Sequence, residues 1–219
     1  LCASRGLGDV YKRQQYDLCD RLEDEAQVSI ITIQSEEGLE IMRHTLAAQV
    51  LARAIKNLYP KSKLAIGPTI ENGFYYDVDS HEVISSDDLT KIEDEMKNII
   101  KTKSLLTKKL VSKSEALEIF KQKKEPFKET IINESEQKND FQLYYQDNEE
   151  FVDLCRGPHL PNLGFIGSFK LTKVSGAYWR GDSKNEMLQR IYGTCWASQK
   201  DLDSYLKKIE EAEKRDHRK

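Results

Sequence analysis

The sequence predicts an α+β fold in which helices pack against an antiparallel sheet. Helical and β-prone segments follow one another without the regular βαβ order of a parallel sheet. Asn72-Gly73 separates two β-prone runs, a spacing typical of a hairpin. With 219 residues the chain is long enough for one large domain with appendages, and its sequence contains no P-loop or GxGxxG phosphate motif.

The N-terminal half is expected to place a hairpin between two long helices. The first helix opens at Ser35, carries apolar residues at three- and four-residue spacing, and ends before Pro60. Residues 64–70 and 74–78 are expected to be the paired strands. A second amphipathic helix is expected over residues 86–103, with acidic residues in its first turn.

Shorter segments follow in the C-terminal half. The expected strands are residues 105–111, 127–132, 141–145, 167–174 and 177–180, and the expected helices are residues 114–123, 186–197 and 199–217. Charges of both signs alternate along the last helix, which indicates a solvated linker.

Bulk composition excludes several classes of protein. The net charge of −3 leaves no overall basic field to attract nucleic acid, although short lysine-rich stretches occur. The 4 cysteines show no CxxC pair and no regular disulfide spacing, which favours a reducing, cytoplasmic setting. No apolar run approaches the roughly 20 residues that span a bilayer, so no membrane association is expected.

The segment Asp153-Leu-Cys155-Arg156-Gly-Pro-His159 carries the densest chemistry in the chain. A thiol and an imidazole lie four residues apart across a Gly-Pro bend, and a carboxylate precedes the thiol by two residues. Cysteine and histidine in such proximity are typical of metal sites and of hydrolytic sites. A buried cysteine beside an unrelated surface histidine is the commoner fate of such a pair. The bend and the preceding β-prone run favour a functional site.

Five stretches, taken together and in order, closely resemble the N-terminal region of bacterial threonyl-tRNA synthetase. They are EGLEIMRH at 37–44, IGPTIENGFYYD at 66–77, DLCRGPH at 153–159, GAYWRGD at 176–182 and QRIYG at 189–193. One such motif would be weak evidence, but five in the right order are specific. The resemblance covers residues 16–219 and implies the α+β editing domain that threonyl- and alanyl-tRNA synthetases share.

The resemblance also implies a division of the chain. Residues 16–34 resemble the end of the ubiquitin-like TGS domain, residues 35–200 the editing domain, and residues 201–219 a linker helix toward a catalytic domain that this chain does not contain. Residues 1–15 include a run that looks like translated adapter sequence, so a non-native or disordered segment is expected there. We therefore expect a fragment that lacks the ligase site.

In this family the editing domain hydrolyses serine from wrongly charged threonine tRNA. One methyl group distinguishes the two amino acids, which gives a binding pocket only about 1–3 kcal/mol of discrimination, so a second, hydrolytic site is needed. The implied partner is the acceptor end of threonine tRNA. No cofactor is expected in this fragment. Zinc, ATP and a homodimer interface are expected in the absent catalytic domain.

The resemblance implies eight site residues. Those expected in catalysis are His44, Lys128, Asp153, Cys155 and His159, and those expected in substrate binding are Gln49, Tyr76 and Arg156. The imidazole of His159 is expected to orient or activate water. The ammonium of Lys128 is expected to stabilise charge on the ester oxygen or to bind the terminal adenosine's phosphate. The carboxylate of Asp153 is expected to receive the seryl hydroxyl or amine.

The first helix departs from the family, which has two histidines four residues apart on one helical face. Aligned from the left, His44 is the first histidine and Ala48 replaces the second. Aligned from the right, across one extra residue before Ala54, Thr45 and Gln49 fill the two positions. Both alignments lack a second imidazole, so no metal is expected. A tRNA acceptor-stem binding module with weakened or lost chemistry is therefore the alternative function.

Overall fold

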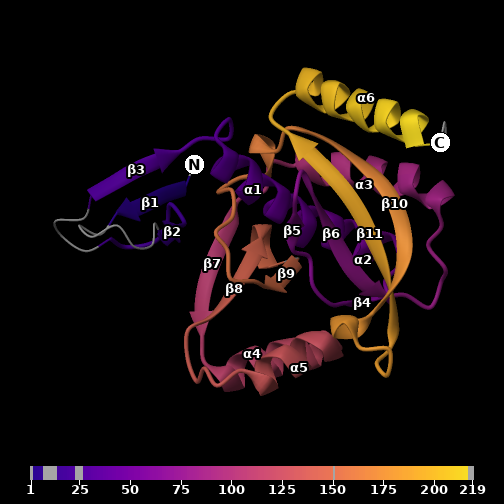
Figure 1. Ribbon diagram of the computed structural model, residues 1–219. Coiled ribbons are helices and arrows are strands. Elements are labelled where there is room, and N and C mark those ends of the chain that lie inside the picture. Colours follow the sequence, from indigo (N-terminus) through magenta and orange to yellow (C-terminus); the bar gives the residue numbers. More distant parts are fainter. Residues whose placement is uncertain (1, 7–13, 23–26, 150, 217–219) are drawn as a thin grey trace.

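Three antiparallel sheets and their covering helices form the part of the chain that the computed structural model describes, residues 2–6, 14–22, 27–149 and 151–216. The largest sheet has the strand order β10-β11-β6-β4, and β5 pairs with β6 (Figure 1). Its strands are β4 (Lys63–Leu64), β5 (Thr69–Ile70), β6 (Gly73–Asp79), β10 (Ser168–Tyr178) and β11 (Met187–Trp196). The predicted α+β class with antiparallel sheets is confirmed.

Two smaller sheets complete the described part of the chain. The first has the order β7-β8-β9 and contains β7 (Leu106–Val111), β8 (Phe141–Gln146) and β9 (Phe151–Leu154). The second has the order β2-β1-β3 and contains β1 (Cys2–Gly6), β2 (Gln14–Tyr16) and β3 (Gln27–Ile31). Strand β9 leads directly into the loop that carries Cys155 and His159, so the first small sheet positions that loop.

The first long helix is built from three consecutive segments, α1 (Glu36–Thr45), a π-helix (Leu46–Leu51) and α2 (Ala52–Leu58). The hydroxyl of Ser35 caps its start by accepting the backbone N–H of Gly38 at 3.1 Å. The buried apolar face of the helix belongs to the main core and packs against β6 and β11. The π segment fits one more residue into the helix than regular α geometry would, which matches the extra residue expected from the sequence.

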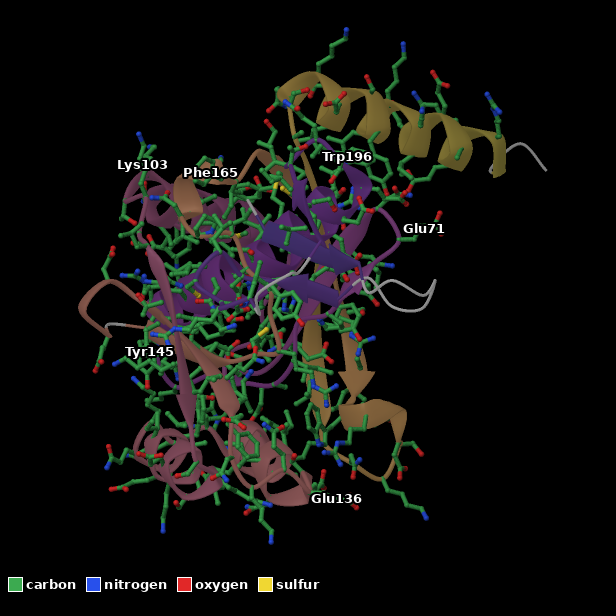
Figure 2. All side chains as sticks on the ribbon, turned by 90° about the vertical axis from the view of Figure 1, so that its left-hand side faces the viewer. Glu71, Lys103, Glu136, Tyr145, Phe165 and Trp196 are labelled. Atoms are coloured by element: carbon green, nitrogen blue, oxygen red, sulfur yellow. The ribbon has the colours of Figure 1, made fainter. Side chains whose placement is uncertain are left out.

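The remaining helices surround the sheets. They are α3 (Leu89–Lys101), preceded by a 3₁₀ turn at Ser86–Asp88, and α4 (Lys113–Gln122), α5 (Pro126–Glu134) and α6 (Gln199–Asp216). Figure 1 shows α4 and α5 together at one end of the molecule and α6 across the opposite end of β10 and β11. In Figure 2, Trp196 lies below α6, where its ring packs on Tyr205 with a centroid separation of 4.9 Å.

The predicted hairpin is confirmed. Ile70 of β5 pairs with Gly73 of β6 across Glu71 and Asn72. Asn72 has φ 57°, the left-handed conformation that asparagine tolerates better than most residues. The strands predicted at residues 105–111 and 141–145 are also confirmed, as β7 and β8.

The strand predicted at residues 127–132 is wrong, because this segment forms α5. Its β-branched residues suggested a strand, but Pro126 occupies the first helical turn, where its missing N–H costs nothing. Phe127 and Ile131 pack with Trp179, while Ile132 joins the core around Phe120. Burial at positions one turn apart therefore outweighed local strand propensity.

The helix predicted at residues 186–197 is also wrong, because these residues form strand β11. Its apolar residues recur at helical spacing, which misled the prediction. The strand lies between β10 and β6, and both of its faces are partly buried. Its sequence therefore does not alternate simply between apolar and polar residues. Residues 167–174 and 177–180, predicted as two strands, form the single strand β10 with a bulge between Leu171 and Lys173, followed by a 3₁₀ turn.

Part of the N-terminal segment predicted to be non-native or disordered forms strands. Cys2–Gly6 pairs along β3 from Cys2↔Ile31 to Gly6↔Gln27, and β2 pairs on its other side. Backbone pairing on a sheet edge does not depend on particular side chains, so a segment of any origin can add there. Residues 1 and 7–13 lie outside the described residues. The adapter origin stays a prediction.

Candidate functional site

A cavity of about 1050 Å³ brings together residues from distant parts of the sequence. Helical residues on one side include Glu40, His44 and Ala48, and residues on the other sides include Lys128, Asp153, Cys155 and Arg156. Five of the eight predicted site residues therefore line one cavity. The other three are Gln49, Tyr76 and His159, which the structure places behind its walls.

One wall of the cavity is an imidazole–thiol pair. Nε2 of His44 lies 2.7 Å from Sγ of Cys155. The same sulfur accepts the backbone N–H of Gly157 at 3.4 Å. The imidazole of His44 also makes a hydrogen bond to the backbone of Gly67. This arrangement suits a neutral imidazole that donates to Gly67 and presents its Nε2 lone pair to the thiol.

Burial lowers the pKa of His44 below its ordinary value of 6.5. Asp153 and Glu40 act in the opposite direction through their negative charge, and Lys128 reinforces the lowering. His44 is consequently a neutral base at pH 7. A neutral imidazole is the form that accepts a proton from water.

His159 lies behind His44 rather than at the cavity surface. The two rings stack with centroids 4.7 Å apart and planes 7° from parallel. His159 is only 1% exposed. His44 is therefore the imidazole that faces the cavity, and the expected action of His159 on water stays a prediction.

Thr45 fixes the tautomer of His159. Its hydroxyl donates to the Ile41 carbonyl at 2.8 Å and lies 3.1 Å from Nδ1 of His159. A hydroxyl has one proton, so it accepts here, and Nδ1 of His159 carries the ring hydrogen. The backbone N–H of Leu160 donates to the same oxygen at 3.0 Å.

The opposite wall is a buried ion pair. Nζ of Lys128 lies 2.6 Å from Oδ1 of Asp153, and both side chains are almost fully buried. The Tyr76 hydroxyl donates to Oδ2 at 3.2 Å, and the Leu154 N–H donates to Oδ1 at 2.8 Å. Burial first, and Asp153 second, hold the pKa of Tyr76 well above its ordinary value, so its phenol remains a donor. Tyr76 thus supports Asp153 and does not line the cavity.

Gln49 does not line the cavity, and its role in substrate binding stays a prediction. Its side chain is fully buried. Nε2 of Gln146 donates to the Gln49 side-chain oxygen at 3.1 Å and to the Gln49 backbone oxygen at 2.6 Å. Ala48 lines the cavity one helical turn after His44. The π segment begins immediately after Thr45, so the left-hand alignment describes the cavity wall, with a methyl group where the family has its second imidazole.

Sequence reasoning missed a group of contacts beneath the Cys155–His159 loop. Gly157 has φ 62° and passes so close to Tyr144 that an added Cβ would lie 2.0 Å from its hydroxyl. That hydroxyl donates to Asp17 at 2.6 Å, and the Tyr144 ring meets His159 edge-on at 4.4 Å. The pair Tyr144–Asp17 joins residues 127 positions apart, so sequence spacing offered no signal.

The cluster of His44, Cys155 and His159 does not fit a metal ion as it stands. Its ligand atoms all lie within 4.8 Å of one another. A metal lies in the plane of each imidazole that binds it, but the two stacked rings are nearly parallel, so their planes do not converge on one ion. Nδ1 of His159 is also committed to Thr45, and Ala48 offers no further ligand.

Comparisons with known proteins agree with the resemblance. Residues 142–192 match the family described as the threonyl and alanyl tRNA synthetase second additional domain. The chain is 46% identical over 217 residues to the threonine–tRNA ligase of Prochlorococcus marinus (strain MIT 9211). That match covers 99% of this chain and 34% of the relative, so the chain spans about a third of the relative's length. The predicted resemblance is confirmed.

Proposed function

Because the chain carries the domain shared by threonyl and alanyl tRNA synthetases, we propose that it hydrolyses the ester linking serine to threonine tRNA. The observation that carries this proposal is a neutral imidazole, His44, facing a large cavity opposite the buried Lys128–Asp153 pair. A base and a fixed charge pair across one cavity are the groups that ester hydrolysis requires.

In the proposed reaction, water attacks the ester carbonyl carbon while His44 accepts its proton. The tetrahedral oxyanion forms close to Lys128. Its collapse breaks the bond to the ribose oxygen, which takes the proton back from His44. The products are free serine and tRNA with a free terminal hydroxyl. The Cys155 thiol is hydrogen-bonded to the lone pair of His44 until water takes its place. Cys155 forms no covalent bond to the substrate in this reaction.

The ion pair also suits recognition of the amino acid. Lys128 is too deeply buried to hold a backbone phosphate, which favours its role at the ester oxygen. Asp153 presents a carboxylate to the cavity for the seryl ammonium or hydroxyl. Arg156 is exposed on the cavity rim and is the proposed contact for the anionic acceptor end.

The activity of a whole ligase is a wider proposal. Threonine ligation, with ATP and zinc bound in a catalytic domain and dimerisation through that domain, follows from the relative's name and not from these residues. A cytoplasmic location is proposed on the same ground. Among the residues that the structure describes, no helix is both long and apolar enough to cross a membrane.

Ala48 favours a second candidate function, a tRNA acceptor-stem binding module with weak chemistry. Its methyl group stands on the cavity wall in the position of the family's second imidazole. A site with one base at the cavity can bind a charged tRNA end without cutting it efficiently. The two functions differ only in whether the bound ester is hydrolysed.

The deciding experiment measures release of radiolabelled serine from threonine tRNA by the purified 219-residue chain. We expect hydrolysis, with His44→Ala slower by about a hundredfold because the base is lost. Threonine on the same tRNA is the matched control and should be released far more slowly, because its extra methyl crowds the pocket. Binding of the charged tRNA without release of serine would favour the binding module. Equal, slow release of both amino acids by wild type and His44→Ala would contradict editing.

A further inference from the structure

Asp17 connects the segment before the editing domain to the Cys155–His159 loop. Its Oδ1 accepts the backbone N–H of His159 at 2.9 Å. Its Oδ2 accepts the Tyr144 hydroxyl at 2.6 Å and Nζ of Lys108 at 3.0 Å. Asp17 is only 8% exposed, so both carboxylate oxygens are engaged within the protein.

The contacts around Asp17 hold its carboxylate in place. Its own backbone N–H donates to Oδ2 of Asp20 at 2.9 Å, which closes a tight turn. Lys108 pairs with both carboxylates and is itself largely buried. A buried carboxylate with a cation and two further hydrogen-bond donors has little freedom to move.

This carboxylate acts on His159 from two directions. It fixes the backbone at His159 directly and fixes the Tyr144 ring, which packs on the His159 imidazole in a T-shaped contact. His159 in turn stacks on His44, the base that faces the cavity. A chain of direct contacts therefore runs from Asp17 to the proposed base.

We propose that Asp17 is a positioning residue for His159, so that a segment outside residues 35–200 completes the hydrolytic site. The inference rests on the proposed deacylase function. It assigns residues 17–20 to the site rather than to a neighbouring domain alone. Asp17 does not touch the cavity among the described contacts, so it acts through His159 and not on the substrate.

A double-mutant cycle tests this role. Asp17→Ala should lower kcat for seryl-tRNA hydrolysis by about tenfold to a hundredfold, with KM within about twofold, because a small displacement of a catalytic group has effects of that size. In a His159→Ala background the same change should lower kcat less than twofold. Asp94→Ala is the matched control, because it makes the same change at an exposed carboxylate that pairs with Lys97. It should stay within about twofold of wild type.

A structural readout separates this inference from the proposed function. In the NMR spectrum, Asp17→Asn should move the His159 amide proton upfield, because a neutral acceptor makes a weaker hydrogen bond than a carboxylate. This measurement does not depend on enzymatic activity. It also remains possible if Asp17→Ala does not fold, because it uses Asp17→Asn. An unchanged His159 resonance, or equal loss of kcat in both backgrounds, would overturn the role of Asp17. A wild-type chain without deacylase activity would sink the proposed function, while the resonance would still decide the contact.

Discussion

The two walls of the cavity hold their polar groups in opposite ways. On one wall Asp153 binds Lys128, Tyr76 and the backbone of Leu154, so its charge is compensated by several partners. On the other wall His44 is a neutral base whose Nε2 contacts the Cys155 thiol. The first arrangement fixes charge, and the second leaves a proton acceptor ready for exchange. Hydrolysis of an ester requires both properties.

The difference also shows where this chain tolerates change. Removing a partner from the ionic wall would leave a buried charge without compensation, which is costly. The imidazole wall has a methyl group at Ala48 in place of an imidazole, and Ala48 is still buried. Changes in the ionic wall should therefore affect folding as well as rate, whereas changes in the imidazole wall should affect mainly rate.

The largest expected effect comes from breaking the ionic wall. Lys128→Met keeps the aliphatic stem but leaves Asp153 buried without its cation, and should lower the free energy of unfolding by about 3–5 kcal/mol. Urea denaturation measures this loss. Arg180→Met is the matched control, because its pair with Glu134 is exposed. It should cost less than about 1 kcal/mol. Equal losses in the two variants would remove the distinction between the walls.

A smaller effect is expected from rebuilding the imidazole wall. Ala48→His places a ring in the cavity one turn from His44 and should raise the rate of seryl-tRNA hydrolysis by up to about tenfold. Gln49→His is the neighbouring control. It should bring no gain, because that side chain is buried against Gln146. A gain from Gln49→His alone would show that the right-hand alignment describes the working site.

The smallest effect is a pH dependence that belongs to the imidazole wall. The folded-state pKa of His44 lies below the unfolded value of about 6.5, so the unfolded chain binds more protons between these two values. The contribution of neutral His44 to the free energy of unfolding is present above pH 6.5 and is lost as the pH falls toward the folded-state pKa. We expect the free energy of unfolding to fall faster below pH 6.5 in wild type than in His44→Gln, by at most about 1.4 kcal/mol per pH unit.

Urea titrations of both proteins between pH 7.5 and 5.5 measure this difference. Parallel curves would show that His44 is not held neutral by burial. The rising limb of kcat against pH should likewise have its midpoint below 6.5 in wild type, because the base stays neutral to lower pH.

Local sequence identified elements where propensity and burial agree. The first helix, the Asn72 hairpin and strands β7 and β8 follow from spacing and turn chemistry. The predicted secondary structure was wrong at α5 and β11. Tertiary packing decides which of their residues are buried, and the spacing of apolar residues along the sequence does not show it. An isolated sequence cannot show that β11 has neighbours on both sides, and such a strand loses its alternation.

The sequence by itself determined the chemistry of the site: a thiol and an imidazole on one short loop, a single histidine on the first helix, and one residue too many after it. Tertiary structure decided which imidazole faces the cavity and which side chain stands beside it. It also brought Asp17 to His159, 142 positions away. The physical reason is that chemical identity is local, whereas orientation depends on which surfaces pack together. One inserted residue absorbed by a π-helix rotates the helical positions that follow it, and the direction of that rotation is set by the packed core.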